Sequence, residues 1–292
     1  MIRSFLFVPA DSEKKLAKGF ESGADAVILD LEDSVATDRK DAARAMALAF
    51  LQQHAAQGKR PRLVVRVNAL DTGLTDADLD AVVPGKPDLI LLPKAEGGAS
   101  VVHLDAKLAA REATHGLPEG AIGIIALATE TAAALFVCAT YRGSSPRLAG
   151  ITWGAEDLSA ELGAETNRDA AGRFTSPYWL ARNLALAAAA AARVQPIDTV
   201  YADFRNMSGL RQEAEEARRD GFTAKMAIHP AQVGVINEVF TPTADAIENA
   251  NAVVAAFAAD PTAGVVAIGG VMYDRPHLTR AQRLLARLRS QA

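Results

Sequence analysis

Short runs of apolar and β-branched residues recur along this chain, and each is followed by a longer segment with the spacing of a helix. Eight of these runs have the length of a strand, at residues 4–8, 26–31, 63–67, 89–92, 122–127, 150–153, 199–202 and 225–228. Their apolarity is continuous rather than alternating, which is typical of parallel strands covered on both faces. We therefore expect an α/β protein with a mostly parallel sheet.

Helical periodicity fills the gaps between the strand candidates. Helices are predicted at residues 12–22, 38–54, 100–114, 131–140, 177–193, 208–220 and 231–239, with a short one at 75–81. Eight strands separated by helices favour a closed (β/α)8 TIM barrel over an open doubly wound sheet. The open sheet stays an alternative, although neither G-x-G-x-x-G nor a P-loop is present.

The pattern changes after the eighth strand candidate. Residues 243–259 and 279–289 read as two further helices around a glycine-rich stretch at 264–274. About 50 residues bury too little surface to be stable alone, so we predict an appendage rather than an independent domain. The expected organisation is a TIM-barrel catalytic domain at 1–240 and a helical C-terminal extension at 241–292, packing on a neighbouring subunit.

Composition narrows the class of protein. Half of the 292 residues are apolar and the formal net charge is −4, so no overall basic field indicates binding to nucleic acid or to an anionic membrane. The longest apolar stretch, 184–192, is far shorter than a membrane span, and the amino terminus lacks the pattern of a signal peptide. The single cysteine, Cys138, lies in an apolar run and is predicted to be a core residue. We expect a cytoplasmic protein.

Polar residues follow the predicted strands closely. Where a strand candidate ends, the chain carries acids, bases or an amide: Asp11; Asp30, Glu32 and Asp33; Arg66 and Asn68; Lys94 and Glu96; Glu130; Glu156 and Asp157; Asp203; and His229. In a TIM barrel the carboxyl ends of all strands meet at one rim, where the chemistry takes place. The sequence thus predicts a crowded polar site at that rim.

The crowding of carboxylates indicates a metal ion. Acids at this density repel one another unless a cation joins them, and carboxylates completed by water and substrate oxygens are the usual environment of Mg²⁺. Glu130 and Asp157 follow consecutive strands and should be neighbours, so we predict that they hold the ion. The rim lacks cysteine and has one histidine, which argues against zinc. The alternative for each acid is a charge in the first turn of a helix, stabilised by the helix dipole.

Two cationic residues at the rim allow two interpretations each. Arg66 ends an apolar strand and needs a partner there, either a substrate carboxylate bound by two hydrogen bonds or an internal salt bridge to Asp30 or Glu32. Lys94 is open to the same two interpretations. A Schiff-base role for Lys94 is redundant beside a metal site.

Eight segments resemble one known family. They are 3–9 (RSFLFVP), 25–35 (DAVILDLEDSV), 65–68 (VRVN), 92–94 (LPK), 129–131 (TET), 154–158 (GAEDL), 225–232 (KMAIHPAQ) and 270–276 (GVMYDRP). In this order they resemble the citrate lyase β-subunit group of the HpcH/HpaI aldolase superfamily, which includes malyl-CoA lyases. The D-L-E-D-S-V and I-H-P-x-Q segments are the more specific ones.

The resemblance implies a (β/α)8 barrel that assembles as a homotrimer or hexamer, with Mg²⁺ on Glu130 and Asp157 and with Arg66 on the carboxylate of an α-keto or hydroxy acid. Members of the family cleave or form β-hydroxy acyl thioesters, such as citryl, malyl or citramalyl groups on CoA or an acyl carrier. In malyl- and citramalyl-CoA enzymes the C-terminal tail crosses to a neighbouring subunit and supplies a catalytic aspartate, which corresponds to Asp274. Otherwise Asp274 is a cap or turn residue before Pro276. Tyr273 stands where family members often have isoleucine.

The resulting hypothesis is a Mg²⁺-dependent carbon–carbon lyase that releases or condenses an α-keto acid such as oxaloacetate, pyruvate or glyoxylate. Arg66 and backbone N–H groups of Gly154, Ala155 and Glu156 would bind the acid's carboxylate, with Asp274 as the catalytic base. Arg3, Lys14 and Lys94 are candidates for the phosphates of CoA or of the carrier. Three alternatives remain: a malyl- or citramalyl-CoA thioesterase, a pyruvate-type aldolase that needs no thioester, and a lyase subunit that depends on an acyl-carrier partner.

Overall fold

A closed barrel of eight parallel strands forms the larger part of this protein, whose computed structural model describes residues 2–289. The strands are β1 (Ser4–Pro9), β2 (Ala26–Asp30), β3 (Arg62–Arg66), β4 (Leu89–Ala95), β5 (Gly123–Ala128), β6 (Leu148–Trp153), β7 (Gln195–Asp198) and β8 (Ala224–Ala227). They pair in sequence order, and the barrel closes where Phe5 of β1 pairs with Met226 of β8. The predicted TIM barrel is therefore confirmed, and the open sheet is wrong.

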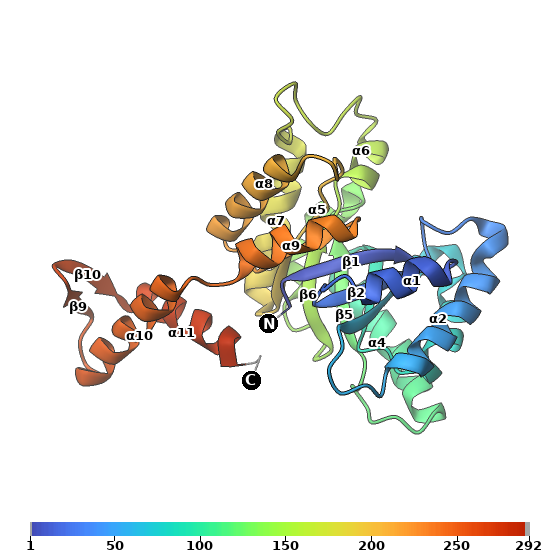
Figure 1. Ribbon diagram of the computed structural model, residues 1–292, viewed down its shortest axis with the longest axis horizontal. Coiled ribbons are helices and arrows are strands. Elements are labelled where there is room, and N and C mark those ends of the chain that lie inside the picture. Colours follow the sequence, from blue (N-terminus) through green and yellow to red (C-terminus); the bar gives the residue numbers. More distant parts are fainter. Residues whose placement is uncertain (1, 290–292) are drawn as a thin grey trace. The chain divides into compact units, whose positions relative to one another are not determined.

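Helices connect the strands and surround the barrel (Figure 1). They are α1 (Glu13–Phe20), α2 (Lys40–His54), α3 (Thr75–Val82), α4 (Gly97–Thr114), α5 (Ala132–Val137), α6 (Glu156–Leu162), α7 (Ser176–Ala192), α8 (Met207–Asp220) and α9 (Pro230–Phe240), with 3-10 turns η1 (Thr37–Arg39), η2 (Leu70–Thr72), η3 (Val83–Gly85) and η4 (Cys138–Tyr141). Side-chain caps start several of them: the Ser12 hydroxyl accepts a hydrogen bond from the Lys15 N–H at 3.4 Å. Helix α6, which was not predicted, stops after about two turns at Gly163, whose φ is +66°.

Alternate residues of each strand point toward the barrel axis. The core there is built from Phe5, Ala26, Ile28, Val64, Leu91, Ile125, Leu127, Ile197, Ala224 and Met226. Because side chains alternate along a strand, Asp30 follows Ile28 on the inner face, and Arg66 follows Val64 in the same way. The apolar core therefore ends in a polar layer at the carboxyl ends of the strands.

Strand β7 lies upstream of its predicted position. Residues 199–202 were expected to form it because they include β-branched and aromatic side chains, but the strand is Gln195–Asp198. Two of its four residues, Gln195 and Asp198, are polar, so this segment lacks the apolar run that predicts a buried strand. Asp198 is buried because Lys225 Nζ lies 2.6 Å from its carboxylate and the Trp153 indole N–H donates to it at 2.8 Å. Asp203, expected to end this strand, is an exposed loop residue instead.

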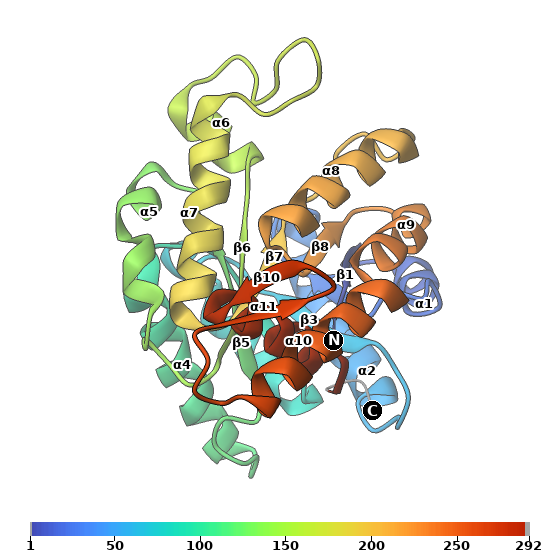
Figure 2. The same ribbon diagram turned by 90° about the vertical axis from the view of Figure 1, so that its left-hand side faces the viewer.

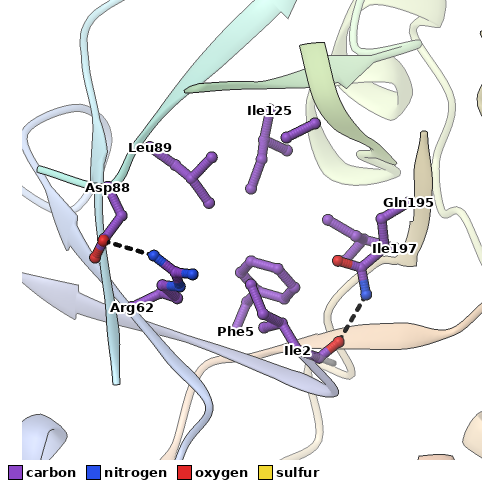
Figure 3. A pocket seen from close by; sticks show the side chains of 9 residues that line it. Ile2, Phe5, Arg62, Asp88, Leu89, Ile125, Gln195 and Ile197 are labelled. Atoms are coloured by element: carbon purple, nitrogen blue, oxygen red, sulfur yellow. Dashed lines mark hydrogen bonds and ion pairs between the residues drawn. The ribbon is translucent and has the colours of Figure 1, made fainter. Parts of the chain in front are cut away.

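The amino-terminal end of the barrel contains a pocket (Figure 3). Apolar side chains from four strands, Phe5, Leu89, Ile125 and Ile197, point toward one another around it. The Arg62 guanidinium at its edge donates to the carboxylate of Asp88 at 2.9 Å. This end lies opposite the polar layer, and neither Glu130 nor Asp157 lines this pocket.

Residues 239–289 form a second compact unit. Its elements are α10 (Ala244–Ala259), β9 (Val265–Ile268), β10 (Val271–Asp274) and α11 (Arg275–Arg289). The unit contains the two predicted helices, and in addition β9 and β10, which pair as an antiparallel hairpin that was not predicted (Figure 2). Gly269 and Gly270, at φ +58° and +83°, form its two-residue turn, a conformation that glycine adopts without steric cost. Val253, Phe257 and Ala281 form the small core between the two helices.

Two expectations from composition can be compared with the structure. Cys138 is buried at 5% exposure, and its thiol donates to the Ala134 carbonyl, as expected for a core residue. Among the helices of residues 2–289, none has both the length and the apolarity needed to cross a lipid bilayer.

Candidate active site

A pocket of about 420 Å³ opens at the carboxyl ends of the strands. Residues that line it include Phe7, Asp30, Arg66, Leu127, Glu130, Thr152, Gly154, Ala155, Glu156, Asp157 and Met226. Both predicted metal ligands and the predicted carboxylate-binding arginine are thus brought together, although they are 91 positions apart at the extremes (157 − 66). Parallel strand order explains this, because Arg66 ends β3, Glu130 follows β5, and Asp157 lies in the first turn of the helix that follows β6.

The carboxylate of Glu130 is placed by an unusual backbone turn. Thr129, just after β5, has a φ of +64°, and Lys94 in β4 has a φ of +48°. Both values lie in the left-handed region, which costs energy for residues with a β-carbon. The backbone N–H of Lys94 donates to Glu130 Oε2 at 2.6 Å. Two strained residues therefore hold a carboxylate that is only 3% exposed at the pocket wall.

A glycine makes room for this carboxylate. A β-carbon built on Gly154 would lie 2.9 Å from Glu130 Cγ, 3.0 Å from Glu130 Oε1 and 3.1 Å from Leu127 Cδ2. These distances are shorter than ordinary contacts, so the segment after β6 can approach Glu130 only because residue 154 lacks a side chain. The same approach brings Asp157, in the first turn of α6, to the rim.

Glu130 and Asp157 form an acidic pair that fits a divalent cation. Burial, and then the negative charge of Asp157, raise the pKa of the Glu130 carboxyl well above its usual range. The Asp157 side chain is 34% exposed and lies 3.3 Å from Lys94 Nζ. Within residues 2–289 no cluster of three or more His, Cys, Asp or Glu is arranged for a metal. Two carboxylates leave positions for water and substrate, as Mg²⁺ requires.

Arg66 makes the internal salt bridges that were one of its two interpretations. Its Nε and Nη2 donate to the two carboxylate oxygens of Asp30 at 2.7 Å each, and Nη1 lies 2.7 Å from Glu32 Oε2 and 3.4 Å from Asp33 Oδ2. Burial alone would raise the pKa of Asp30, but the bonds from Arg66 hold it below its usual value. A guanidinium has five N–H groups, and hydrogen bonds to Asp30 and Asp33 use three of them. Arg66 therefore keeps donors for a ligand.

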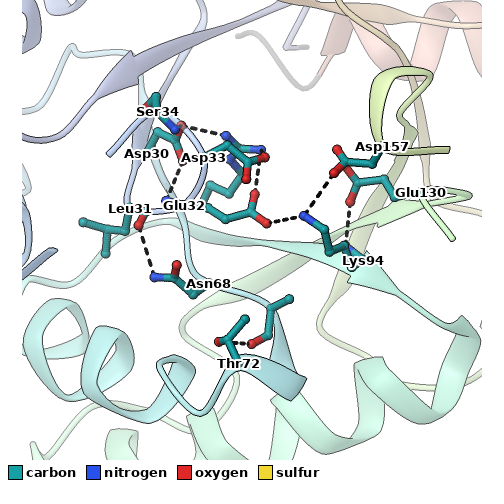
Figure 4. A network of polar contacts seen from close by, with 12 residues as sticks. Asp30, Leu31, Glu32, Asp33, Ser34, Asn68, Thr72, Lys94, Glu130 and Asp157 are labelled. Carbon is teal, nitrogen blue, oxygen red and sulfur yellow. Dashed lines mark hydrogen bonds and ion pairs between the residues drawn. The ribbon is translucent and has the colours of Figure 1, made fainter. Parts of the chain in front are cut away.

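Lys94 lies between the acids that contact Arg66 and the acidic pair of Glu130 and Asp157 (Figure 4). Its ammonium lies 2.7 Å from Glu32 Oε1 on one side and 3.3 Å from Asp157 Oδ1 on the other. Burial would lower the pKa of Lys94, but these acids raise it above its usual value. A protonated amine is no nucleophile, so the geometry argues against a Schiff-base role. Glu32, one of the two acids that the sequence offered as a salt-bridge partner of Arg66, is the residue that joins Arg66 to Lys94.

Several predicted site residues lie elsewhere. Arg3 precedes β1 at the amino-terminal end of the barrel, where its guanidinium binds the Asp25 carboxylate at 2.7 and 2.8 Å, so its prediction as a ligand for CoA at the rim is wrong. Asn68 donates to the Leu31 carbonyl and to the buried carboxylate of Asp78, and it supports the loop after β2 instead of facing the pocket. The sequence did not predict Asp78 as the partner of Asn68, because no local pattern indicates that an acid in a helix pairs with a distant loop.

The two remaining predicted groups differ in their surroundings. Ala155 and Glu156 line the pocket at the start of α6, and the Glu156 side chain accepts from Asn167 Nδ2 at 2.9 Å. Asp274 ends β10 in the second unit, with its side chain 51% exposed, and its carboxylate contacts the ring Nδ1 of His277. Hydrogen bonding to His277 lowers the pKa of Asp274, so this carboxylate is ionised over a wide pH range.

Comparison of the chain with known proteins identifies its family. Residues 3–230 match the profile of the family described as HpcH/HpaI aldolase/citrate lyase. The chain belongs to this family. Citrate lyase subunit beta of Escherichia coli K12 is 36% identical over 287 residues, which are 98% of this chain and 92% of that protein. A (3S)-malyl-CoA thioesterase of Cereibacter sphaeroides KD131 is 37% identical, over 98% of this chain and 94% of its own.

A solved structure extends the likeness to three dimensions. The crystal structure of CitE from Mycobacterium tuberculosis in complex with magnesium, acetoacetate and coenzyme A superposes with a TM-score of 0.75 at 34% identity, and it covers 98% of this chain and 97% of that one. The predicted resemblance to the citrate lyase β-subunit group is thus confirmed over nearly the whole chain.

Proposed function

We propose that this family member is a Mg²⁺-dependent carbon–carbon lyase that cleaves or forms a β-hydroxy acyl thioester, with a 2-oxo acid (an α-keto acid) as one product or substrate. The observation that carries the proposal is the acidic pair of Glu130 and Asp157 in the pocket at the barrel mouth, with the pKa of Glu130 raised by burial and by its neighbour. A similar protein has been crystallised with magnesium, a small oxo acid and CoA.

Each residue at the mouth has a part in this proposal. Glu130 and Asp157 hold the ion, which when bound supplies Lewis-acid stabilisation of negative charge on the oxygens of the oxo acid. The donors that Arg66 keeps beyond Asp30 bind the carboxylate of the oxo acid, together with backbone N–H groups of Gly154, Ala155 and Glu156. Lys94 lies between Glu32 and Asp157, offsets the repulsion between these two carboxylates and stays protonated, as a positioning residue.

Proton transfer is assigned to the C-terminal unit. In the condensing direction Asp274 removes a proton from the carbon next to the thioester carbonyl, that carbon bonds to the oxo carbon of the acid, and the oxo oxygen takes a proton from water to become the hydroxyl. In the cleaving direction the hydroxyl gives its proton to water, the same carbon–carbon bond breaks, and Asp274 returns a proton to the carbon next to the thioester carbonyl. Since Asp274 lies outside the barrel unit, we propose that it serves the barrel of a neighbouring subunit in a homotrimer or hexamer. CoA or an acyl carrier bears the thioester.

The test is cleavage of malyl-, citramalyl- and citryl-CoA by the full-length protein, with Mg²⁺ or with EDTA. We expect the oxo acid to appear with Mg²⁺, and a loss of at least about 100-fold in Glu130→Gln or Asp157→Asn. Glu161→Gln removes an exposed acid from the same helix α6 and is the matched control, with parental activity expected. Full activity in EDTA, or in either ligand variant, would exclude the proposal.

A thioesterase is the second candidate, because one relative at 37% identity carries that name. Hydrolysis would give CoA and the intact hydroxy acid, whereas the lyase gives an acyl-CoA and an oxo acid. Chromatography of the same reaction mixtures separates the two. Free malate or citramalate as the first product, with no oxo acid, would assign the thioesterase.

A further inference from the structure

Thr152 carries a buried hydroxyl that lacks a partner. It belongs to β6, is 1% exposed, and its Oγ1 has no hydrogen-bond partner among the described residues. Burying a hydroxyl without a partner costs free energy, and nearly all such groups in folded proteins are satisfied. Thr152 also lines the pocket at the barrel mouth. An unsatisfied donor that faces a pocket is available to a ligand.

The pocket that Thr152 lines is poor in cations, and one part of its wall is apolar. Phe7, Leu127 and Met226 line the same pocket and form its apolar wall. Among the described residues that line it, Arg66 is the one cationic side chain, and it already faces Asp30, Glu32 and Asp33. In the proposed function its remaining donors take the first carboxylate of the oxo acid. Lys94 and the bound ion are already matched by Glu32, Glu130 and Asp157, so a second carboxylate would be buried without a counter-charge of its own, which is strongly unfavourable.

We infer that this pocket selects monocarboxylic 2-oxo acids, whose substituent is hydrogen or methyl, over dicarboxylic ones, and that the Thr152 hydroxyl donates a hydrogen bond to the bound acid. The inference rests on the proposed function, because it needs the oxo acid at the mouth. Thr152 is then a specificity residue. Its unsatisfied hydroxyl destabilises the free protein and is satisfied in the complex.

Calorimetric titration of the Mg²⁺-loaded, full-length protein with pyruvate and with fresh oxaloacetate tests the inference. We expect pyruvate to bind at least about 10-fold more tightly. Thr152→Val keeps the shape and removes the hydroxyl, so pyruvate should bind about 5- to 10-fold more weakly, while Thr152→Ser should retain most of the affinity. Without ligand, Thr152→Val should melt roughly 2 °C higher than the parent, a gain that a purely supporting role would not produce.

Tyr178→Phe is the matched control. It removes another buried hydroxyl that has no partner in the described part of the chain, on α7 and away from the pocket lining. It should raise the melting temperature without changing pyruvate binding. Mg²⁺-dependent binding of both acids with equal affinity, or unchanged pyruvate affinity in Thr152→Val, would overturn the inference alone. Absence of any Mg²⁺-dependent oxo-acid binding would overturn the proposed function as well.

Discussion

Adding one methyl group at Gly154 should damage both stability and the metal site. In Gly154→Ala the new β-carbon would lie 2.9 Å from Glu130 Cγ and 3.1 Å from Leu127 Cδ2. Carbon atoms in contact normally lie ~3.5–4.0 Å apart, so the Glu130 side chain must move by roughly 0.5 Å or more. Leu127 is buried in the barrel core and offers little room. Overpacking of this kind costs about 1–3 kcal/mol, and each kcal/mol lowers the melting temperature by roughly 2–4 °C.

The displaced carboxylate should also bind Mg²⁺ more weakly, because this ion tolerates little distortion of its ligands. We expect a loss of about 10- to 100-fold in affinity, measured by titrating Mg²⁺ into melting and activity assays. Gly234→Ala is the control: it lies in α9 with ordinary φ and with no atom within 4 Å of the added carbon, so it should stabilise the helix by about 1 kcal/mol. Parental melting and Mg²⁺ dependence in Gly154→Ala would refute the packing argument.

Three further perturbations follow from the same contacts. Because the pKa of Glu130 is raised, its contribution to stability is complete below the ordinary pKa of glutamate and is lost as the pH rises through the raised pKa. In EDTA, Glu130→Gln should therefore melt at a higher temperature than the parent at about pH 8 and at nearly the same temperature at acid pH. Equal melting temperatures of the two proteins at every pH would contradict this. Glu112→Gln leaves the buried guanidinium of Arg147 partly unpaired and should cost about 3 kcal/mol in urea unfolding, whereas a change within error would show that the pair contributes nothing. Asp274→Asn should lower turnover at least about 100-fold with pyruvate binding intact; normal turnover would remove Asp274 from the mechanism.

Local sequence patterns were enough to predict the barrel, the polar rim and the acidic pair. Continuous apolar runs predict buried parallel strands wherever the strand itself is apolar, and the residue after such a run must then lie at the rim. Glu130 and Asp157 could therefore be predicted from the sequence as neighbouring metal ligands, because strand order alone makes them neighbours. The same reasoning failed at β7, where the polar strand residue Asp198 is tolerated only because Lys225 and Trp153, from neighbouring strands, bind its carboxylate.

The sequence by itself determined which residue types gather at the mouth of the barrel, since that depends on strand order and on the spacing of two along each strand. Tertiary structure decided what each of them contacts. From the sequence Arg66 was open to a substrate and to a salt bridge, and the structure shows Asp30 across two N–H···O bonds of 2.7 Å. The unsatisfied hydroxyl of Thr152 is visible only in three dimensions, because a missing hydrogen bond is a property of everything packed around an atom and of no single segment.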